Sequence, residues 1–183
     1  MSTRSAHPRC SVFIATSLDG FIARSDGAID WLSIVERPGE DYGFGEFFSS
    51  VDTLVMGRKT WEVALGFPEW PYAGKRVVVM SRHPQRPRHG ETFHSGPPDE
   101  LVATLAAEEV RHVYVDGGAT IRAFLAAGLI DELTVSIIPV LLGSGIPLFG
   151  DGVRETGLSL RSSRAFDSGL LQLRYGVGSA ESR

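Results

Sequence analysis

Leu54-Val55-Met56-Gly57-Arg58-Lys59-Thr60-Trp61 places a short apolar run before a glycine, two cations and a threonine. Residues 53–56 predict a buried strand, and residues 58–64 predict the helix that follows it. A helix begins with free backbone N–H groups and the positive end of its dipole, so an anion is stabilised there. Arg58, Lys59 and the Thr60 hydroxyl would strengthen the binding of a phosphate. The alternative is an ordinary helix start with two solvated cations.

Val113-Tyr114-Val115-Asp116-Gly117-Gly118-Ala119-Thr120 repeats this order of strand, glycine and helix. Its paired glycines would let a ligand approach the backbone closely. Alternatively, they serve only the geometry of a tight turn between the strand at 113–115 and a helix at 119–127. A third buried strand is predicted at residues 76–80, and Ser81-Arg82 follows it directly.

The carboxyl ends of these three strands are expected to meet. Open parallel sheets bind ligands at the carboxyl ends of their strands, so the three segments should converge on one edge of the sheet. Arg82 is the expected ligand contact there, whereas Arg86 and Arg88 are expected to be solvated.

The succession of short apolar strands and helical patterns predicts an α/β fold, with a largely parallel sheet covered on both faces. Residues 158–166 and 170–177 flank an Asp167-Ser168-Gly169 turn, which predicts a C-terminal antiparallel hairpin and makes the sheet mixed. The other predicted elements are strands at 10–16 and 133–138, a short extended piece at 21–23, a helix at 41–50, a helix at 99–109 with Asp99 as its cap, and loops at 18–31 and 81–98.

Composition limits the class of protein. A chain of 183 residues with 43% hydrophobic residues predicts one domain, at residues 10–178, after a disordered tail at 1–9. The net charge of −4 argues against a nucleic-acid partner. The single cysteine, Cys10, excludes an intrachain disulfide and fits a reducing compartment. No apolar run approaches the roughly 20 residues that span a bilayer, so no membrane partner is expected and the predicted location is the cytoplasm.

Several common site motifs are missing from the sequence. The five histidines show no HxH or HExxH spacing, so no metal is expected. GxGxxG, Walker and GxSxG patterns are also missing. Gly143-Ser144-Gly145 could be a phosphate loop, but a bent connection between strands is expected because no helical pattern follows.

Reduction of a C=N bond by hydride also needs a proton on the nitrogen. A carboxyl group beside an apolar pocket suits this task, because burial raises its pKa. Asp41, ahead of Phe44 and Phe48, is the candidate in this chain. The alternative is an acid that only stabilises the N-terminus of a helix.

Together these segments resemble the dihydrofolate reductase superfold. Residues 55–62 resemble that family's NADPH-phosphate motif, and residues 78–82 resemble the strand that ends at the adenosine. Asp116-Gly117-Gly118 resembles its glycine pair at the pyrophosphate and nicotinamide. The resemblance spans residues 11–177 and implies a dihydrofolate reductase-like fold of three α/β/α layers, with NADPH as the cofactor.

The resemblance also implies the residues of a site. Ala15 would meet the carboxamide of the cofactor through its backbone, and the loop at 18–31 would close over the nicotinamide. Asp41 is the implied catalytic residue, at the same distance ahead of Met56-Gly57-Arg58 as the folate-contacting carboxylate of bacterial folate reductases. The implied cofactor-binding residues are Ala15, Asp19, Gly20, Gly57, Arg58, Lys59, Thr60, Ser81, Arg82, Gly117, Gly118, Ala119 and Thr120, and the implied substrate-binding residues are Trp31, Phe44, Phe48 and Leu141.

Residues 17–23 and 139–149 are most similar to the C-terminal reductase domain of the riboflavin enzyme RibD and to its stand-alone relatives. That domain reduces a ribosylaminopyrimidine with NADPH. The resemblance therefore implies a reductase of 5-amino-6-(5-phosphoribosylamino)uracil or of a similar small heterocycle, without the fused zinc deaminase. By analogy, a homodimer is expected. The alternatives are a true dihydrofolate reductase, an NADPH-binding module without turnover, and a flavin-binding protein.

Overall fold

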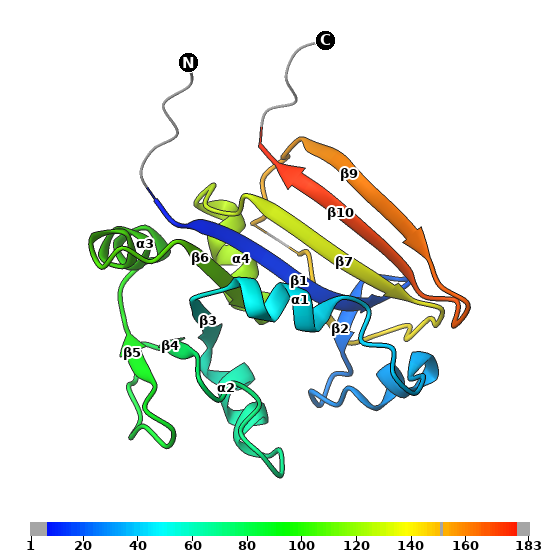
Figure 1. Ribbon diagram of the computed structural model, residues 1–183, viewed down its shortest axis with the longest axis horizontal. Helices are drawn as coiled ribbons and strands as arrows, with labels where there is room; N and C mark the ends of the chain where they lie inside the picture. The colour runs from blue at the N-terminus through cyan, green and yellow to red at the C-terminus, as the bar shows by residue number, and fades with distance from the viewer. Residues whose placement is uncertain (1–6, 151, 179–183) are drawn as a thin grey trace.

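One continuous sheet of eight strands runs through the computed structural model, which describes residues 7–150 and 152–178 (Figure 1). The strand order is β5-β4-β3-β6-β1-β7-β10-β9, and a separate pair joins β2 to β8. The strands are β1 (Arg9–Ser17), β2 (Phe21–Ala23), β3 (Thr53–Gly57), β4 (Arg76–Met80), β5 (Thr92–His94), β6 (His112–Asp116), β7 (Glu132–Ile138), β8 (Ile146–Pro147), β9 (Leu158–Ala165) and β10 (Leu171–Val177). The helices are η1 (Asp30–Val35), α1 (Phe44–Ser50), α2 (Arg58–Leu65), α3 (Pro98–Ala107) and α4 (Gly118–Ala126).

The sheet is parallel from β5 across to β7 and antiparallel beyond it, as predicted. Strands β5, β4, β3, β6, β1 and β7 pair in parallel, each with the next. β10 pairs antiparallel with both β7 and β9. The turn at Asp167-Ser168-Gly169 closes the hairpin through a hydrogen bond from Gly169 N to the Phe166 carbonyl oxygen.

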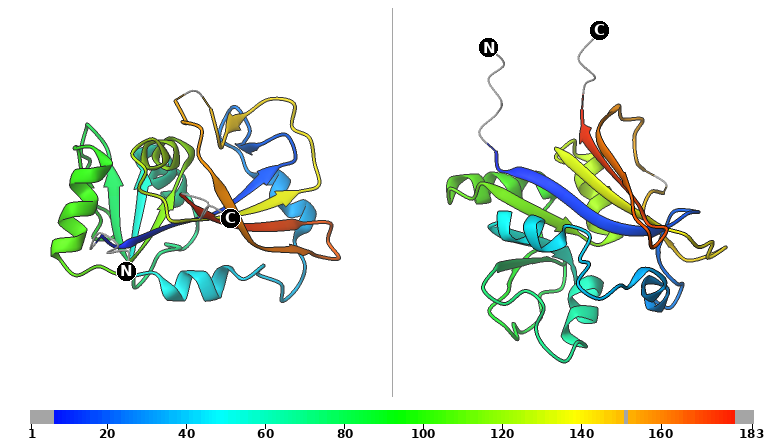
Figure 2. Two further views of the ribbon diagram at one scale, coloured as in Figure 1. Left: turned by 90° about the horizontal axis from the view of Figure 1, so that it is seen from above. Right: turned by 45° about the vertical axis from the view of Figure 1, so that its right-hand side comes forward.

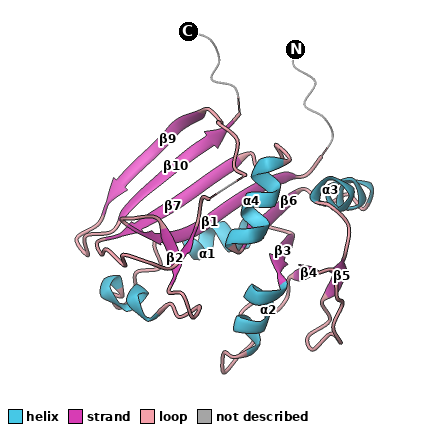
Figure 3. Ribbon diagram, turned by 180° about the vertical axis from the view of Figure 1, so that it is seen from behind, coloured by secondary structure: helices cyan, strands magenta, loops and turns pink. Residues whose placement is uncertain are grey.

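Helices cover both faces of the parallel part, so the predicted three layers are confirmed. Side chains alternate along each strand because successive residues point to opposite faces. Val55 and Val78 pack in one core with residues of α3 and α4. Leu54 and Met56 pack in the other core, which includes Trp61 of α2. Figure 2 shows α1 and α4 on opposite sides of the sheet, and Figure 3 shows α4 from its own side.

Three short elements were not predicted, and one cap was wrong. The elements β5, β8 and η1 span three, two and six residues, which is too short for a clear periodic pattern. The residue that caps α3 is Pro97, without a side-chain hydrogen bond, whereas the prediction placed Asp99 there. Asp99 lies in the first turn instead, where a carboxylate is also stabilised by the helix dipole.

The predicted tail at residues 1–9 falls partly outside the described structure. Residues 1–6 lie outside it, whereas Arg9 already belongs to β1. Within residues 7–150 and 152–178, none of the helices is both long and apolar enough to cross a membrane.

A polar cluster around the buried His112 joins the amino ends of β1 and β6. The His112 ring nitrogens lie 2.8 Å from Ser11 Oγ and 3.0 Å from the Ser50 carbonyl oxygen. Asp52 accepts hydrogen bonds from the backbone N–H groups of Arg111 and His112. Burial lowers the pKa of His112 below its ordinary value, so the folded chain holds this imidazole neutral.

This cluster gives a testable contribution to stability. The unfolded chain binds a proton at His112 at a higher pH than the folded chain does, so the contribution is present above about pH 6.5 and is lost as pH falls below it. Measured by thermal unfolding across this range, the stability difference between the wild type and His112→Gln should shrink toward acid pH. The exposed His83 serves as control, because His83→Gln should leave the wild-type pH profile unchanged. A difference that stays constant with pH would contradict this account.

Candidate functional site

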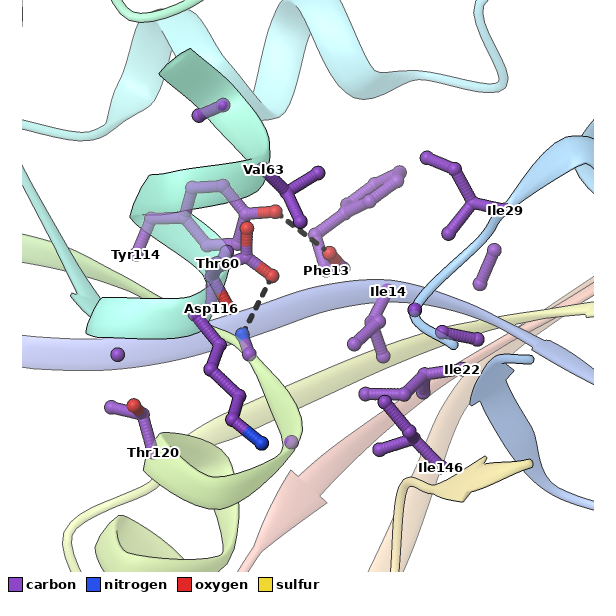
Figure 4. Close-up of a pocket in the computed structure, with 18 of the residues that line it drawn as sticks. Phe13, Ile14, Ile22, Ile29, Thr60, Val63, Tyr114, Asp116, Thr120 and Ile146 are labelled. Atoms are coloured by element: carbon purple, nitrogen blue, oxygen red, sulfur yellow. Dashed lines mark hydrogen bonds between the residues drawn. The ribbon is translucent and has the colours of Figure 1, made fainter. Parts of the chain in front are cut away.

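A cavity of about 1720 Å³ lies along the carboxyl ends of β4, β3 and β6 and continues toward β1 and β7 (Figure 4). Helix α2 contributes Thr60 and Val63 to its wall, and the segment at residues 27–44 lines the opposite part. Phe13 and Ile14 come from β1, which crosses the middle of the sheet. The cavity therefore lies at the edge where parallel sheets bind ligands.

The predicted convergence of three strand ends is confirmed. β4, β3 and β6 are neighbours in the sheet, and the residues after each of them line the same cavity. The implied cofactor residues that line it are Ala15, Gly57, Arg58, Lys59, Thr60, Ser81, Arg82, Gly117, Gly118, Ala119 and Thr120.

Two helices begin side by side at this edge. Helix α2 starts after Gly57 and helix α4 after Gly117, and neither start has a side-chain cap. A Cβ atom at Gly117 would lie 2.3 Å from Thr60 Oγ1, and one at Gly57 would lie 2.9 Å from Thr120 Oγ1. Each glycine thus lets the two helix starts approach. Apart from the Gly117 N–H, which Asp116 accepts, the N–H groups of both first turns lie at this edge with the two threonine hydroxyls.

These residues fit the phosphates of a dinucleotide. Uncapped helix N-termini attract anions, and Arg58, Lys59 and Arg82 add positive charge at the same edge. Arg58 also forms an ion pair of 3.2 Å with Glu62 on the following helical turn, and both side chains stay partly exposed. That surface pair is weak enough to exchange for a phosphate.

Part of this end of the cavity was not predicted from the sequence. His94, at the end of β5, lines it together with Ser95 and Gly96. The backbone N–H of Ser81 donates to the His94 carbonyl oxygen over 2.9 Å, which fixes β5 beside the end of β4. His94 Nε2 is buried and has no hydrogen-bond partner within the described part of the chain. A strand of only three residues in a loop rich in proline gave no periodic signal for this wall.

Asp116 is the acid whose environment suits a proton donor. It is half-buried at the end of β6 and lines the cavity, and its carboxylate accepts the backbone N–H of Gly117 over 2.8 Å. Burial raises its pKa to about 6, and the Gly117 N–H opposes part of that rise. Figure 4 shows its carboxyl group near Thr60 and Tyr114. In the sequence, Asp116 stands out only as part of the glycine motif at residues 116–118.

Asp41 has the opposite environment. Burial was predicted to raise its pKa, but the side chain is exposed at the rim of the cavity. Its two carboxylate oxygens accept the N–H groups of Gly43 and Gly45 over 2.9 and 3.0 Å. These hydrogen bonds lower its pKa, so the carboxylate stays ionised at the start of α1. The premise of the proton-donor assignment is therefore wrong, and the alternative of a helix-stabilising acid fits.

Several other implied residues lie outside the lining of the cavity. Phe44 lines it, whereas Phe48 packs in the core beside α2, and Trp31 is buried in a third core with Ile138. Leu141 is 68% exposed. Gly20 does not line the cavity either; it takes a positive φ of 88° in the turn that follows β1.

Asp19 fixes two loops rather than lining the cavity. Its carboxylate accepts hydrogen bonds from the Ser17 hydroxyl and from the backbone N–H groups of Leu142 and Gly143. The Ser17 hydroxyl contributes most to the lowering of the Asp19 pKa. Over residues 7–150 and 152–178, no group of three or more His, Cys, Asp or Glu side chains is placed to bind a metal ion.

Residues 8–172 match the family of the RibD C-terminal domain. The chain belongs to this family. It is 38% identical over 167 residues to YwjB of Bacillus subtilis, a protein without an established function, and the match covers 90% of this chain and 95% of YwjB.

Solved structures agree with this family. A protein of Shewanella sp. PV-4, provisionally assigned to riboflavin biosynthesis, is 38% identical with a TM-score of 0.88 over 93% of this chain and 99% of that one. The deaminase and 5-amino-6-(5-phosphoribosylamino)uracil reductase of Thermotoga maritima shares the fold at 13% identity, with a TM-score of 0.71 over 93% of this chain and 57% of that one.

The glycine at the start of α4 provides a test of the close approach of the two helices. Gly117→Ala would place a Cβ atom against Thr60 at a φ of 88° that other residues rarely adopt. We expect it to lower the free energy of unfolding by about 2–3 kcal/mol and to weaken dinucleotide binding. Chemical unfolding and a fluorescence titration with NADPH measure the two effects.

Gly128→Ala is the matched control. Gly128 also has a positive φ, of 69°, but a Cβ atom there would meet nothing within 4 Å. It should lower the free energy of unfolding by only about 1 kcal/mol and leave dinucleotide binding unchanged. Equal effects of the two substitutions on binding would argue against the role given to Gly117.

Proposed function

We propose that this protein is an NADPH-dependent reductase that transfers hydride to an electron-poor C=N or C=O carbon of a small heterocyclic substrate. One observation carries the proposal: cations and uncapped helix starts from three neighbouring strand ends line a single cavity. Membership of the RibD C-terminal domain family supports it, because relatives of that fold include a 5-amino-6-(5-phosphoribosylamino)uracil reductase.

The chain's own residues divide the work along the cavity. Arg58, Lys59 and Arg82 would hold the phosphates, and the N-termini of α2 and α4 would add backbone donors. When bound, NADPH supplies the hydride. Apolar side chains of the cavity, such as Ile14 and Ile22, exclude water from the reacting atoms. Most of the rate enhancement would then come from positioning the two reactants.

Asp116 would supply the proton. Addition of hydride to the carbon of a C=N or C=O bond leaves the electron pair on the nitrogen or oxygen, which takes up a proton. The carboxyl group of Asp116 faces the cavity and holds its proton up to a pH of about 6. At higher pH the ionised carboxylate would still accept a hydrogen bond from a substrate N–H group.

Cofactor preference tests the cationic end of the cavity. Arg58→Ala and Arg82→Ala should each lower the ratio of kcat/KM for NADPH over NADH by about tenfold to a hundredfold, since each removes a charge-assisted hydrogen bond to the 2′-phosphate that NADH lacks. Arg86→Ala is the control with the same loss of charge, because Arg86 is exposed and does not line the cavity. An unchanged ratio in both variants would refute the assignment.

The pH profile tests Asp116. In the wild type, kcat should fall as pH rises through about 6, because the donor loses its proton. Asp116→Asn should lower kcat by about 10²-fold or more and should remove this limb of the profile. Asp99→Asn, on the exposed first turn of α3, is the control. It should keep the wild-type kcat and its fall as pH rises through about 6. A variant that loses rate but keeps the limb would show that another group donates the proton.

A further inference from the structure

The two ends of the cavity carry opposite charge. Arg58, Lys59, Arg82 and Arg122 line the end at β3, β4 and α4. The other end, which we call the substrate end, is formed by residues 29–44 together with Ile138 and Leu170. The acids that line the substrate end are Glu36, Glu40 and Asp41.

Arg37 is the one cation in this stretch, and three acids share the lining with it. Arg37 Nη1 donates to the Glu36 carbonyl oxygen over 2.7 Å and to the Ile34 carbonyl oxygen over 3.3 Å. The next arginine on this side, Arg164, lines a separate small pocket and lies 4.3 Å over the Phe166 ring. Among the described lining residues, the substrate end therefore has one cation and three acids, whereas the other end has four cations.

Backbone donors at the substrate end are also occupied, in each case by the chain's own carboxylates. Asp41 accepts the N–H groups of Gly43 and Gly45 at the start of α1. Glu40 accepts the N–H of Tyr42 over 2.8 Å. A phosphate that entered this end would lie beside negative charge and could not accept hydrogen bonds from these N–H groups. The free-energy cost of removing its water would therefore not be offset.

The remaining surface of the substrate end is largely apolar. Ile29, Leu32, Val35 and Phe44 line it from one wall, and Ile138 and Leu170 line it from the sheet side. Ser136 supplies a hydroxyl on the floor, where it accepts the side-chain amide of Gln172 over 3.0 Å. A flat ring would pack well here.

We infer that the substrate of this chain is an unphosphorylated heterocycle, neutral or cationic, whose ring lies between residues 29–44 and the sheet. This inference rests on the proposed function. It separates the chain's substrate from the phosphoribosyl compound named for the Thermotoga maritima reductase of the same fold.

A matched pair of compounds tests the inference. NADPH oxidation by the full chain is measured with 5-amino-6-ribosylaminouracil and with its 5′-phosphate. We expect kcat/KM for the unphosphorylated compound to be higher by about tenfold or more, because like charges placed together in a binding site are strongly disfavoured. In Glu36→Lys and Glu40→Lys, this ratio should fall by about tenfold toward the phosphorylated compound.

Glu155→Lys is the control with the same change of charge. Glu155 is exposed and lines neither cavity, so this variant should keep the wild-type ratio. A wild type that prefers the phosphorylated compound would overturn the inference and leave the proposed function standing. A ratio that shifts equally in Glu155→Lys and in the two test variants would also overturn it.

Binding separates this inference from the proposed function. If NADPH is oxidised with neither compound, the proposed function as a reductase of this class of heterocycle is wrong. Calorimetric titration of the NADP⁺-saturated protein with the same two compounds then decides the inference. Tighter binding of the unphosphorylated compound supports it. Equal or tighter binding of the phosphate, or no binding of either compound, overturns it.

Discussion

Parallel hydrogen bonding of β4, β3, β6, β1 and β7 is the constraint on which the rest of the molecule depends. Because these strands run in one direction, the chain leaves each of them at the same edge. The segments that follow β3 and β6 turn directly into α2 and α4, so two helix starts lie side by side. Register then sets the detail: Gly57 pairs with Met80 and Met56 with Asp116, which brings the ends of three strands level.

The helix starts along this cavity differ in whether the chain's own side chains accept their backbone N–H groups. At the starts of α2 and α4 the N-cap residues are glycines without a side-chain cap, and apart from the Gly117 N–H, which Asp116 accepts, the N–H groups of the first turns are left for a ligand. At the start of α1, by contrast, Asp41 occupies the donors itself. One cavity thus combines an end lined by four cations with an end lined by three acids, and the half-buried Asp116 lies in its lining.

Local pattern was sufficient to predict the fold and the cationic end of the cavity. The apolar runs before Gly57 and Ser81 alternate in sequence with helices, which predicts parallel strands. Parallel strands in turn place Arg58 and Arg82 at the same edge of the sheet. The roles of the acids could not be predicted in this way. The pKa of Asp116 depends on burial at a strand end, whereas that of Asp41 depends on two glycine N–H groups. Neither environment is visible in the spacing of residues.

The placement of β1 has a consequence for synthesis of the chain. Its partners are β6 and β7, with Cys10 beside Val113 and Val12 beside Leu133. β1 precedes both partners in the chain, so during synthesis Val12 and Ile14 stay unpaired until β6 and β7 have also emerged. A nascent chain truncated before β7 would lack one neighbour of its central strand, and we expect such a fragment to be held by chaperones rather than to fold.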